Sequence, residues 1–331
     1  MKTEDQNCVK LQVKDLAKKL ISDGHVFLMV GERKFYLMKP GVFVDQSFVK
    51  KHAVNNPIFD FEPVINIEVK DKFKKLFLEL RYLQFEKDLK SKTYEIVNYF
   101  NEVYLSDEHF LSFALACYDE FCSLPLREQA RMHETDMHLF RKALYSSAFS
   151  IIIGMTNDFY QFLMLRDFYN ITFTLDIGLC ESNYSYFVAE ACNAENRMPG
   201  FGIRYLKEEK ASDLEVEVYL GHPERSYKYL KDASLLSYSE LAEVTLYQHE
   251  LSMGSGFPRG IVKNQVSSWE AVVILSDALV EICTDYQFER KVVAYLLSFQ
   301  NSKLVNLPVL KAFQKLCAAF AHFRHEREVG H

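Results

Sequence analysis

Residues 248–260 of this 331-residue chain read Gln-His-Glu-Leu-Ser-Met-Gly-Ser-Gly-Phe-Pro-Arg-Gly. We interpret the first three residues as the end of a helix, and the residues after them as a turn. Gly254 and Gly256 fit a turn because glycine adopts backbone conformations that other residues rarely reach. By itself the stretch predicts a helix cap that leads into a loop, and no particular chemistry.

The composition around this stretch is that of a globular protein. A 49% hydrophobic and 25% charged chain with 12 Gly and 8 Pro is unlike a disordered, low-complexity or fibrous one. Its 39 Lys and Arg against 45 Asp and Glu give a net charge of −6, which argues against general binding of nucleic-acid phosphates. The length allows one large domain or two ordinary ones. The most apolar stretch, residues 143–155, is too short to span a bilayer.

The cysteines and the N-terminus indicate where the protein works. The seven cysteines form no C-x-x-C pair, so neither a disulfide framework nor a zinc knuckle is expected. Residues 1–15 carry acids where a signal peptide needs a basic start and an apolar core. We therefore expect a cytoplasmic protein with neither a membrane nor a nucleic acid as partner.

Residues 1–68 mix strand and helix signals and predict a small α+β module. Asp15 is placed to cap a short helix over residues 16–21. Residues 25–30 and 34–38 are rich in strand formers and are separated by a turn sequence, which predicts a hairpin.

Beyond this module the hydrophobic period becomes helical. Residues 69–125 predict a helical connector, because apolar side chains recur at helical spacing at Phe73, Leu76, Phe77 and Leu80. Pro125 is the clearest helix breaker before residues 126–331, which predict a further helical domain. The fold class is therefore mainly α, with the α+β module at the N-terminus.

Residues 248–260 resemble the His-His-Glu-x-x-x-Gly-x-Gly-Tyr-Pro signature of the HD-GYP family, whose members are bacterial hydrolases of cyclic di-GMP. Four more segments resemble family motifs in the expected order: the opening His helix, the His-Asp-Ile-Gly motif, the His-Pro helix start and the late metal-binding Asp. They are Met137–Arg141, Leu175–Gly178, Gly221–Glu224 and Ser276–Ala278. The resemblance covers residues 126–300 and implies that residues 126–331 form an HD-type helical bundle.

The resemblance also implies a metal site. Family members hold two or three cations on His nitrogens and carboxylate oxygens, and the cations activate a water and clamp the phosphodiester. Four positions retain groups that can ligate: Asp176, His222, His249 and Asp277.

Five motif positions depart from the family pattern. Leu175 replaces the His of the His-Asp pair, and Gln248 replaces the first His of His-His-Glu. Leu179 and Tyr286 stand where the family has Lys and Arg, and Phe257 replaces the Tyr of Gly-Tyr-Pro, next to Pro258. Leucine cannot ligate, and glutamine offers only a neutral carbonyl oxygen. A two-metal cluster is therefore not expected.

Two arrangements of the four remaining residues stay open. The first, which we favour, is a polar network without cofactor, in which Asp176 accepts hydrogen bonds from His222 or His249. The alternative is one Fe, Mn or Zn ion held by two His and two Asp.

The departures lead us to expect a degenerate HD-GYP-like signalling protein. We expect it to act through a protein partner or self-association in cyclic-di-GMP signalling, without phosphodiesterase activity. The alternatives are a residual single-metal cyclic-di-GMP phosphodiesterase and a sensor that binds the dinucleotide without cleaving it. For the sensor, Arg259, Arg290 and Lys291 are the residues available to contact phosphate.

Other polar groups receive ordinary structural interpretations. Asp136 is expected to cap the following helix, while His138 keeps the position of the family's opening His. His322 and His325 are expected to lie near the C-terminal end of a helix, where a basic end suits the helix dipole.

Overall fold

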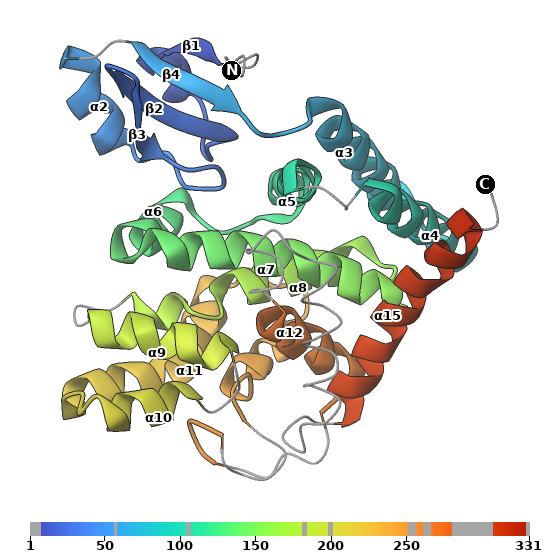
Figure 1. The fold of residues 1–331 in the computed structure, drawn as a ribbon. Helices are drawn as coiled ribbons and strands as arrows, with labels where there is room; N and C mark the ends of the chain where they lie inside the picture. Colours follow the sequence, from blue (N-terminus) through green and yellow to red (C-terminus); the bar gives the residue numbers. More distant parts are fainter. Residues whose placement is uncertain are drawn as a thin grey trace.

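The computed structural model describes most of the chain, and every structural statement below refers to that part. The described ranges are 8–55, 58–103, 107–180, 184–197, 201–250, 256–260, 266–279 and 307–328. Within them the chain is mainly α-helical, with a small antiparallel sheet near the N-terminus (Figure 1). This confirms the predicted fold class. No helix in these ranges is long and apolar enough to cross a bilayer.

Four strands and two short helices form the N-terminal unit. The elements are β1 (Val9–Gln12), α1 (Val13–Leu16), β2 (Gly24–Val30), β3 (Arg33–Met38), α2 (Gln46–Asn55) and β4 (Ile58–Pro63). The order in the sheet is β1-β4-β2-β3, so the last strand in sequence lies between the first two. Val26, Phe59 and Phe61 are buried in the core that joins this sheet to its helices.

The structure confirms the predicted hairpin and corrects the first predicted helix. β2 and β3 pair antiparallel around Gly31, whose φ of 63° suits a glycine turn. The first helix is Val13–Leu16 rather than residues 16–21, and Asp15 lies inside it without capping it. β1 pairs with β4 immediately before Val13, which places the helix start three residues earlier than Asp15 alone suggests.

Three helices follow the sheet and share an aromatic core. They are α3 (Ile67–Tyr82), α4 (Glu86–Val103) and α5 (Asp107–Phe121). The four apolar residues that predicted the first of them are all buried, and the Asn66 side chain caps it by accepting from the Val69 N–H. Phe73 lies edge-on to Phe113 at 4.8 Å between ring centroids, so aromatic packing fixes α3 against α5.

The central helix of the molecule is α7 (Met137–Thr156), which is preceded by α6 (Leu126–Thr135) and followed by α8 (Phe162–Thr174). The Asp136 side chain caps α7 by accepting from the His138 N–H, as predicted. Helices α5, α6, α8 and α12 (Ser268–Ala278) all contact α7. Phe43 of the N-terminal unit also packs on it, with its ring 5.5 Å from that of Phe140.

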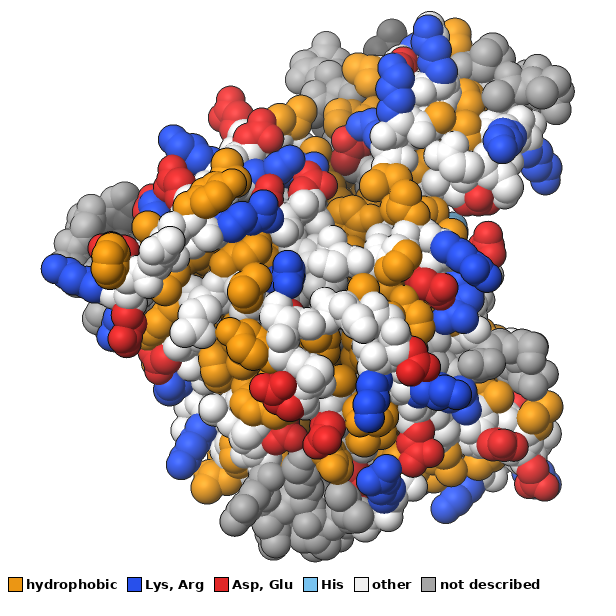
Figure 2. Space-filling model, turned by 180° about the vertical axis from the view of Figure 1, so that it is seen from behind, with side chains coloured by type: hydrophobic (Ala, Val, Ile, Leu, Met, Phe, Trp, Pro, Cys, Tyr) orange, Lys and Arg blue, Asp and Glu red, His pale blue; other side chains and the backbone are white. Residues whose placement is uncertain are grey.

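The remaining elements are η1 (Ile177–Leu179), α9 (Tyr186–Arg197), α10 (Phe201–Glu208), α11 (Asp213–Ala233), η2 (Ser239–Leu246) and α15 (Leu307–Glu328). Among them, α9, α10 and α11 lie on the side of α7 and α8 away from the sheet, whereas α15 runs past the ends of these helices from α4 to beyond α12 (Figure 1). Residues 248–250, interpreted from the sequence as the end of a helix, instead follow the 3₁₀ helix η2 and are not helical themselves. Figure 2 shows acidic and basic side chains interspersed over one face of the molecule, in keeping with the modest net charge.

Candidate functional site

Three of the predicted ligand residues converge in the interior. Asp176 precedes η1, His222 lies in α11, and His249 follows η2. Their ligand atoms all lie within 4.8 Å of one another, and the three residues are buried. The two Nε2 atoms are 3.1 Å apart, and His222 Nε2 is 3.6 Å from Asp176 Oδ1. Segments that are far apart in sequence therefore form one group, which has the chemistry of a metal site.

Asp277, the fourth predicted residue, belongs to the same cluster through a residue that the sequence analysis missed. Lys142 Nζ lies 2.7 Å from Asp176 Oδ2 and 2.9 Å from Asp277 Oδ1. The lysine side chain is 14% exposed, so this is a buried ion triad rather than a surface pair. We call Lys142, Asp176, His222, Gln248, His249 and Asp277 the polar cluster.

The ion triad sets the ionisation of its own members. Burial alone would lower the pKa of Lys142, but the carboxylates of Asp176 and Asp277 outweigh it and raise that pKa, so the side chain is an ammonium. Burial would raise the pKa of Asp176, yet the Lys142 ammonium beside it holds that pKa below its usual value. For Asp277 burial dominates and the pKa is raised, with the Asp176 carboxylate adding to the effect. The ammonium thus compensates two buried acids at once.

Pro223 fixes the orientation of His222. A proline has no N–H, so the carbonyl of Tyr219, four residues earlier in α11, loses its usual helical partner. His222 Nδ1 lies 2.5 Å from this carbonyl oxygen and must donate to it, because a carbonyl only accepts. The Nε2 atom of the neutral ring then carries the lone pair and faces His249 and Asp176. Backbone support of this kind is common for histidines that ligate metals.

Gln248 and the two imidazoles form the neutral half of the polar cluster. Gln248 Nε2 lies 3.0 Å from His222 Nε2 and 2.9 Å from His249 Nε2. Burial lowers the pKa of each imidazole to about 3, and for His222 the neighbouring His249 adds to the effect. The imidazoles are therefore uncharged at neutral pH. His222 Nε2, at 3.6 Å from Asp176 Oδ1, is beyond hydrogen-bond distance of that carboxylate and contacts Gln248 and His249 instead.

The Asp-Ile-Gly segment holds Asp176 against α11. A Cβ on Gly178 would lie 2.2 Å from the His222 carbonyl oxygen, so only glycine permits this approach. Ser226 Oγ accepts from the Gly178 N–H and donates to the Leu175 carbonyl, at 2.9 and 2.7 Å. The substituted motif positions Leu175 and Leu179 are buried in the main hydrophobic core.

His222 itself lies in the middle of α11. We expected Gly221–Glu224 to start a helix, as in the family motif, and this expectation is wrong. The helix begins at Asp213, where Ser212 and Glu215 form a reciprocal capping box. Pro223 is accommodated inside the helix because the Tyr219 carbonyl has the His222 ring as its alternative partner.

Phe257 covers the polar cluster from the motif loop. Its ring stacks on His249 at 4.4 Å between centroids and 13° between planes, and it is 3% exposed. Pro258 follows it through a cis peptide bond, and Gly256 precedes it. Gly254 and Tyr286 lie outside the described residues. The Phe257 ring thus excludes water from one side of His249.

The donor set fits one divalent transition metal and does not fit two. Two neutral imidazoles and one carboxylate form a common triad for such ions. Gln248 Oε1 is buried without a partner among the described residues, and rotating the amide by half a turn would direct it between the two imidazoles. A second ion would need Asp277, whose Oδ1 is held by Lys142, and would face the ammonium. A bound ion would supply Lewis-acid activation of a phosphodiester oxygen.

Other predicted candidates lie apart from the polar cluster. His138 is exposed on the first turn of α7, one turn before Lys142. Arg259 forms an exposed ion pair of 3.5 Å with Glu224. His322 and His325 fall in α15, the predicted C-terminal helix, but their side chains lie outside the described structure, as do Arg290 and Lys291.

A weak signal for Lys142 was present in the sequence. It is the last charged residue before the uncharged stretch 143–157 of the central helix. A charge at the start of such a buried stretch requires a buried partner.

Comparisons with known proteins give little further information. No protein-family model matches the chain, and no curated protein matches it. One solved structure, of Bd1817, a HDG"Y"P protein from Bdellovibrio bacteriovorus, is similar with 12% sequence identity and a TM-score of 0.41. The match covers 96% of this chain and 100% of that chain. At this TM-score we draw no conclusion from the match.

Proposed function

We propose that this chain is a catalytically degenerate HD-GYP-like signalling protein, which acts in cyclic-di-GMP signalling without hydrolysing the dinucleotide. Its sequence motifs support the relationship. The clustering of Asp176, His222 and His249, which come from three of those motifs, supports it further. The surviving residues keep the family's order along the chain and meet in space.

The observation that carries the absence of hydrolysis is the position of Lys142. Its ammonium lies between Asp176 and Asp277, the two carboxylates that a metal cluster of this kind would use. A tethered monovalent cation neutralises the acids, but it has no open coordination position for water or phosphate. Leu175, which stands where the family motif has a His, cannot supply a metal ligand. The polar cluster therefore serves to hold α7, α11 and α12 together.

A protein partner is the proposed route of action. Tyr82, Phe85 and Tyr94 on and between α3 and α4 are 73, 74 and 60% exposed. Aromatic side chains are enriched at protein interfaces because they bury a large area with few rotatable bonds. We propose this connector region as a surface for a partner or a second copy.

The second candidate is a phosphodiesterase with one metal ion. The lone pair of His222 Nε2 faces the polar cluster because Nδ1 donates to the Tyr219 carbonyl, and this favours a ligand role. In this alternative Asp176, His222 and His249 hold one Fe, Mn or Zn ion, and Asp277 keeps Lys142 in place. A third candidate is a cyclic-di-GMP sensor without hydrolysis. In a sensor, the Arg259 side chain would have to leave its ion pair with Glu224 and bind a phosphate of the dinucleotide.

Elemental analysis combined with a hydrolysis assay tests these proposals. The purified protein should contain less than one ion per chain, and should not hydrolyse cyclic di-GMP when Mn²⁺ or Fe²⁺ is added. The His249→Ala variant removes a cluster residue, and His138→Ala is the matched control outside it. Stoichiometric metal with turnover that only His249→Ala abolishes would overturn the degenerate assignment. Calorimetric binding of cyclic di-GMP without turnover would establish the sensor instead.

A further inference from the structure

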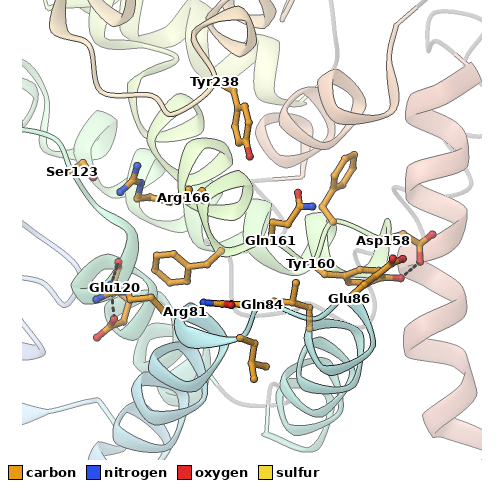
Figure 3. Close-up of a pocket in the computed structure, with 15 residues that line it drawn as sticks. Arg81, Gln84, Glu86, Glu120, Ser123, Asp158, Tyr160, Gln161, Arg166 and Tyr238 are labelled. Carbon is orange, nitrogen blue, oxygen red and sulfur yellow. Dashed lines mark hydrogen bonds and ion pairs between the residues drawn. The ribbon is translucent and has the colours of Figure 1, made fainter.

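A large open pocket lies away from the polar cluster and shares no residue with it. Its cavity volume is about 1010 Å³, and it is bordered by the α3–α4 turn, the ends of α5 and α7, the start of α8 and the start of η2 (Figure 3). We call it the Arg166 pocket. The residues that matter below are Arg81, Gln84, Glu86, Asp158, Tyr160, Gln161 and Arg166.

Most charges around the Arg166 pocket are already compensated. Arg81 pairs with Glu120 at 3.0 Å, and its guanidinium lies 4.6 Å from the Phe162 ring centroid. Asp158 accepts from Lys315 and from the Tyr160 hydroxyl, each at 2.5 Å. Once these pairs are set aside, Arg166 and Glu86 remain as the charges that a ligand can meet.

Arg166 and Glu86 mark opposite ends of the pocket (Figure 3). Among the described residues, the Arg166 guanidinium donates only to Ser237 Oγ, at 2.7 Å, so other guanidinium N–H groups remain for a carboxylate. Glu86 has no ion pair within the described structure and lies near Tyr160. Burial raises the pKa of Tyr160 to about 12, and the Asp158 and Glu86 carboxylates nearby add to the effect.

Two side-chain amides lie between these ends. Gln84 and Gln161 point into the pocket from the α3–α4 turn and from the start of α8 (Figure 3). Neither side chain makes a hydrogen bond within the described part of the chain, although Gln161 occupies the N-cap of α8. A carboxamide carries one donor group and one acceptor on the same plane, which matches the N–H and C=O of a peptide bond. Part of the pocket wall is apolar and is formed by Leu83, Leu89 and Leu163.

The spacing of the two charges limits the size of the ligand. Arg166 lies five positions after Gln161 along α8, and at 1.5 Å per residue the axial distance between them is about 7.5 Å. Glu86 lies near Tyr160, at the far side of Gln161. The ammonium and carboxylate on the α-carbon of one amino acid are too close together to reach both charges. An extended peptide advances about 3.3–3.6 Å per residue, so charged side chains three positions apart span about 10 Å.

We propose that the Arg166 pocket binds a short extended peptide segment of a partner protein, with an acidic side chain against Arg166 and a basic side chain against Glu86. The amides of Gln84 and Gln161 bind the peptide backbone between them, and the leucines contact an apolar side chain. This inference rests on the proposed partner-mediated function, and it names the chemistry of the partner.

Calorimetric titration of the full chain with synthetic peptides tests the inference. The probes are Ac-Lys-Ala-Leu-Asp-NH₂, the reverse sequence Ac-Asp-Leu-Ala-Lys-NH₂, and the uncharged Ac-Gln-Ala-Leu-Asn-NH₂. One of the two charged peptides should bind with a Kd of about 1 mM or lower, and at least about tenfold more tightly than the uncharged one. Both charge orders are included because the pocket accepts a carboxylate and a cation without fixing the chain direction.

Variants locate the binding at the pocket. Arg166→Met and Glu86→Gln should each weaken binding of the charged peptide about tenfold, whereas the exposed controls Arg204→Met and Glu95→Gln should leave it unchanged. The Arg166→Glu variant should come to prefer Ac-Lys-Ala-Leu-Lys-NH₂. Equal affinities for all probes, or affinities that neither pocket variant changes, would overturn the inference. Metal-dependent turnover would overturn the proposed function instead, so the two failures are distinguishable.

Discussion

The polar cluster and the Arg166 pocket differ in whether their charged groups are buried and paired with an opposite charge. In the polar cluster Lys142 lies within 3 Å of both Asp176 and Asp277, and Phe257 covers His249. In the pocket Arg166 and Glu86 lie at an open surface without an ion pair among the described residues. This difference is what the proposed function requires, with a structural role for the polar cluster and recognition at the pocket. Four predictions test this contrast, in order of decreasing effect.

Removing the cation of the polar cluster should have the largest effect. The Lys142→Met variant leaves two carboxylates buried together, and should lower the free energy of unfolding by about 3–5 kcal/mol in denaturant titration. The control Lys315→Met breaks the exposed Asp158 pair and should cost at most about 1 kcal/mol. Mn²⁺ or Zn²⁺ should restore part of the stability of Lys142→Met and leave the parent protein unchanged. A Lys142→Met variant as stable as the parent would contradict the structural role of the ion triad.

A methyl group at Gly178 should have the next largest effect. The Gly178→Ala variant forces a Cβ against the His222 carbonyl, so η1 must move away from α11 at a cost of about 3 kcal/mol. Thermal unfolding followed by circular dichroism measures the loss. Gly31→Ala adds a Cβ that meets nothing within 4 Å, so it isolates the backbone strain of a positive φ. A loss no greater than that of Gly31→Ala would show that the close approach to α11 is dispensable.

Acid should destabilise the protein through its two buried imidazoles. Their pKa is about 3 in the folded protein and about 6.5 when unfolded, so the unfolded state binds more protons below pH 6.5. Stability is therefore lost as the pH falls from about 6.5 towards 3, by about 2 kcal/mol per imidazole at pH 5. The slope of unfolding free energy against pH, measured between pH 7 and 5, should be shallower in His249→Gln and unchanged in the exposed control His138→Gln. An equal slope in both variants would rule out this origin.

The pocket should contribute least to stability. Glu86→Gln and Arg166→Met should each change the free energy of unfolding by no more than about 0.5 kcal/mol, since neither side chain is part of a compensated buried pair. Urea titration of the two variants measures this directly. A loss comparable to that of Lys142→Met would show that the pocket residues hold the fold together, and the contrast between the two regions would fail.

The sequence predicted the residues of the polar cluster better than the way they interact. Motif order was enough to place Asp176, His222 and His249 together, although the local structures expected around His222 and His249 were wrong. The role of Lys142 was not predicted, since its partners lie 34 and 135 positions away. His222 lies in the middle of α11 because the helix starts at a capping box that begins ten residues earlier. The motif Gly221–Glu224 does not include that capping box.

In the N-terminal unit, the local sequence pattern predicted the β2–β3 hairpin but not the strands β1 and β4 that complete the sheet. β4 lies between β1 and β2, so its pairing with Val9–Gln12 joins segments about fifty residues apart. No turn signal marks such a pairing. The prediction of a helix over residues 16–21 was wrong for the same reason. The pairing of β1 with the distant strand β4 ends just before Val13 and determines where the helix starts.

The cation of the ion triad is covalently part of the chain, because Lys142 is a residue of α7. A metal ion must be acquired from solution, is lost to chelators, and stabilises only in proportion to its free concentration. The Lys142 ammonium is delivered with the polypeptide, and its local concentration beside Asp176 and Asp277 does not depend on supply. The contacts of this triad across α7, η1 and α12 are therefore complete as soon as the chain has folded, in metal-starved and metal-replete cells alike.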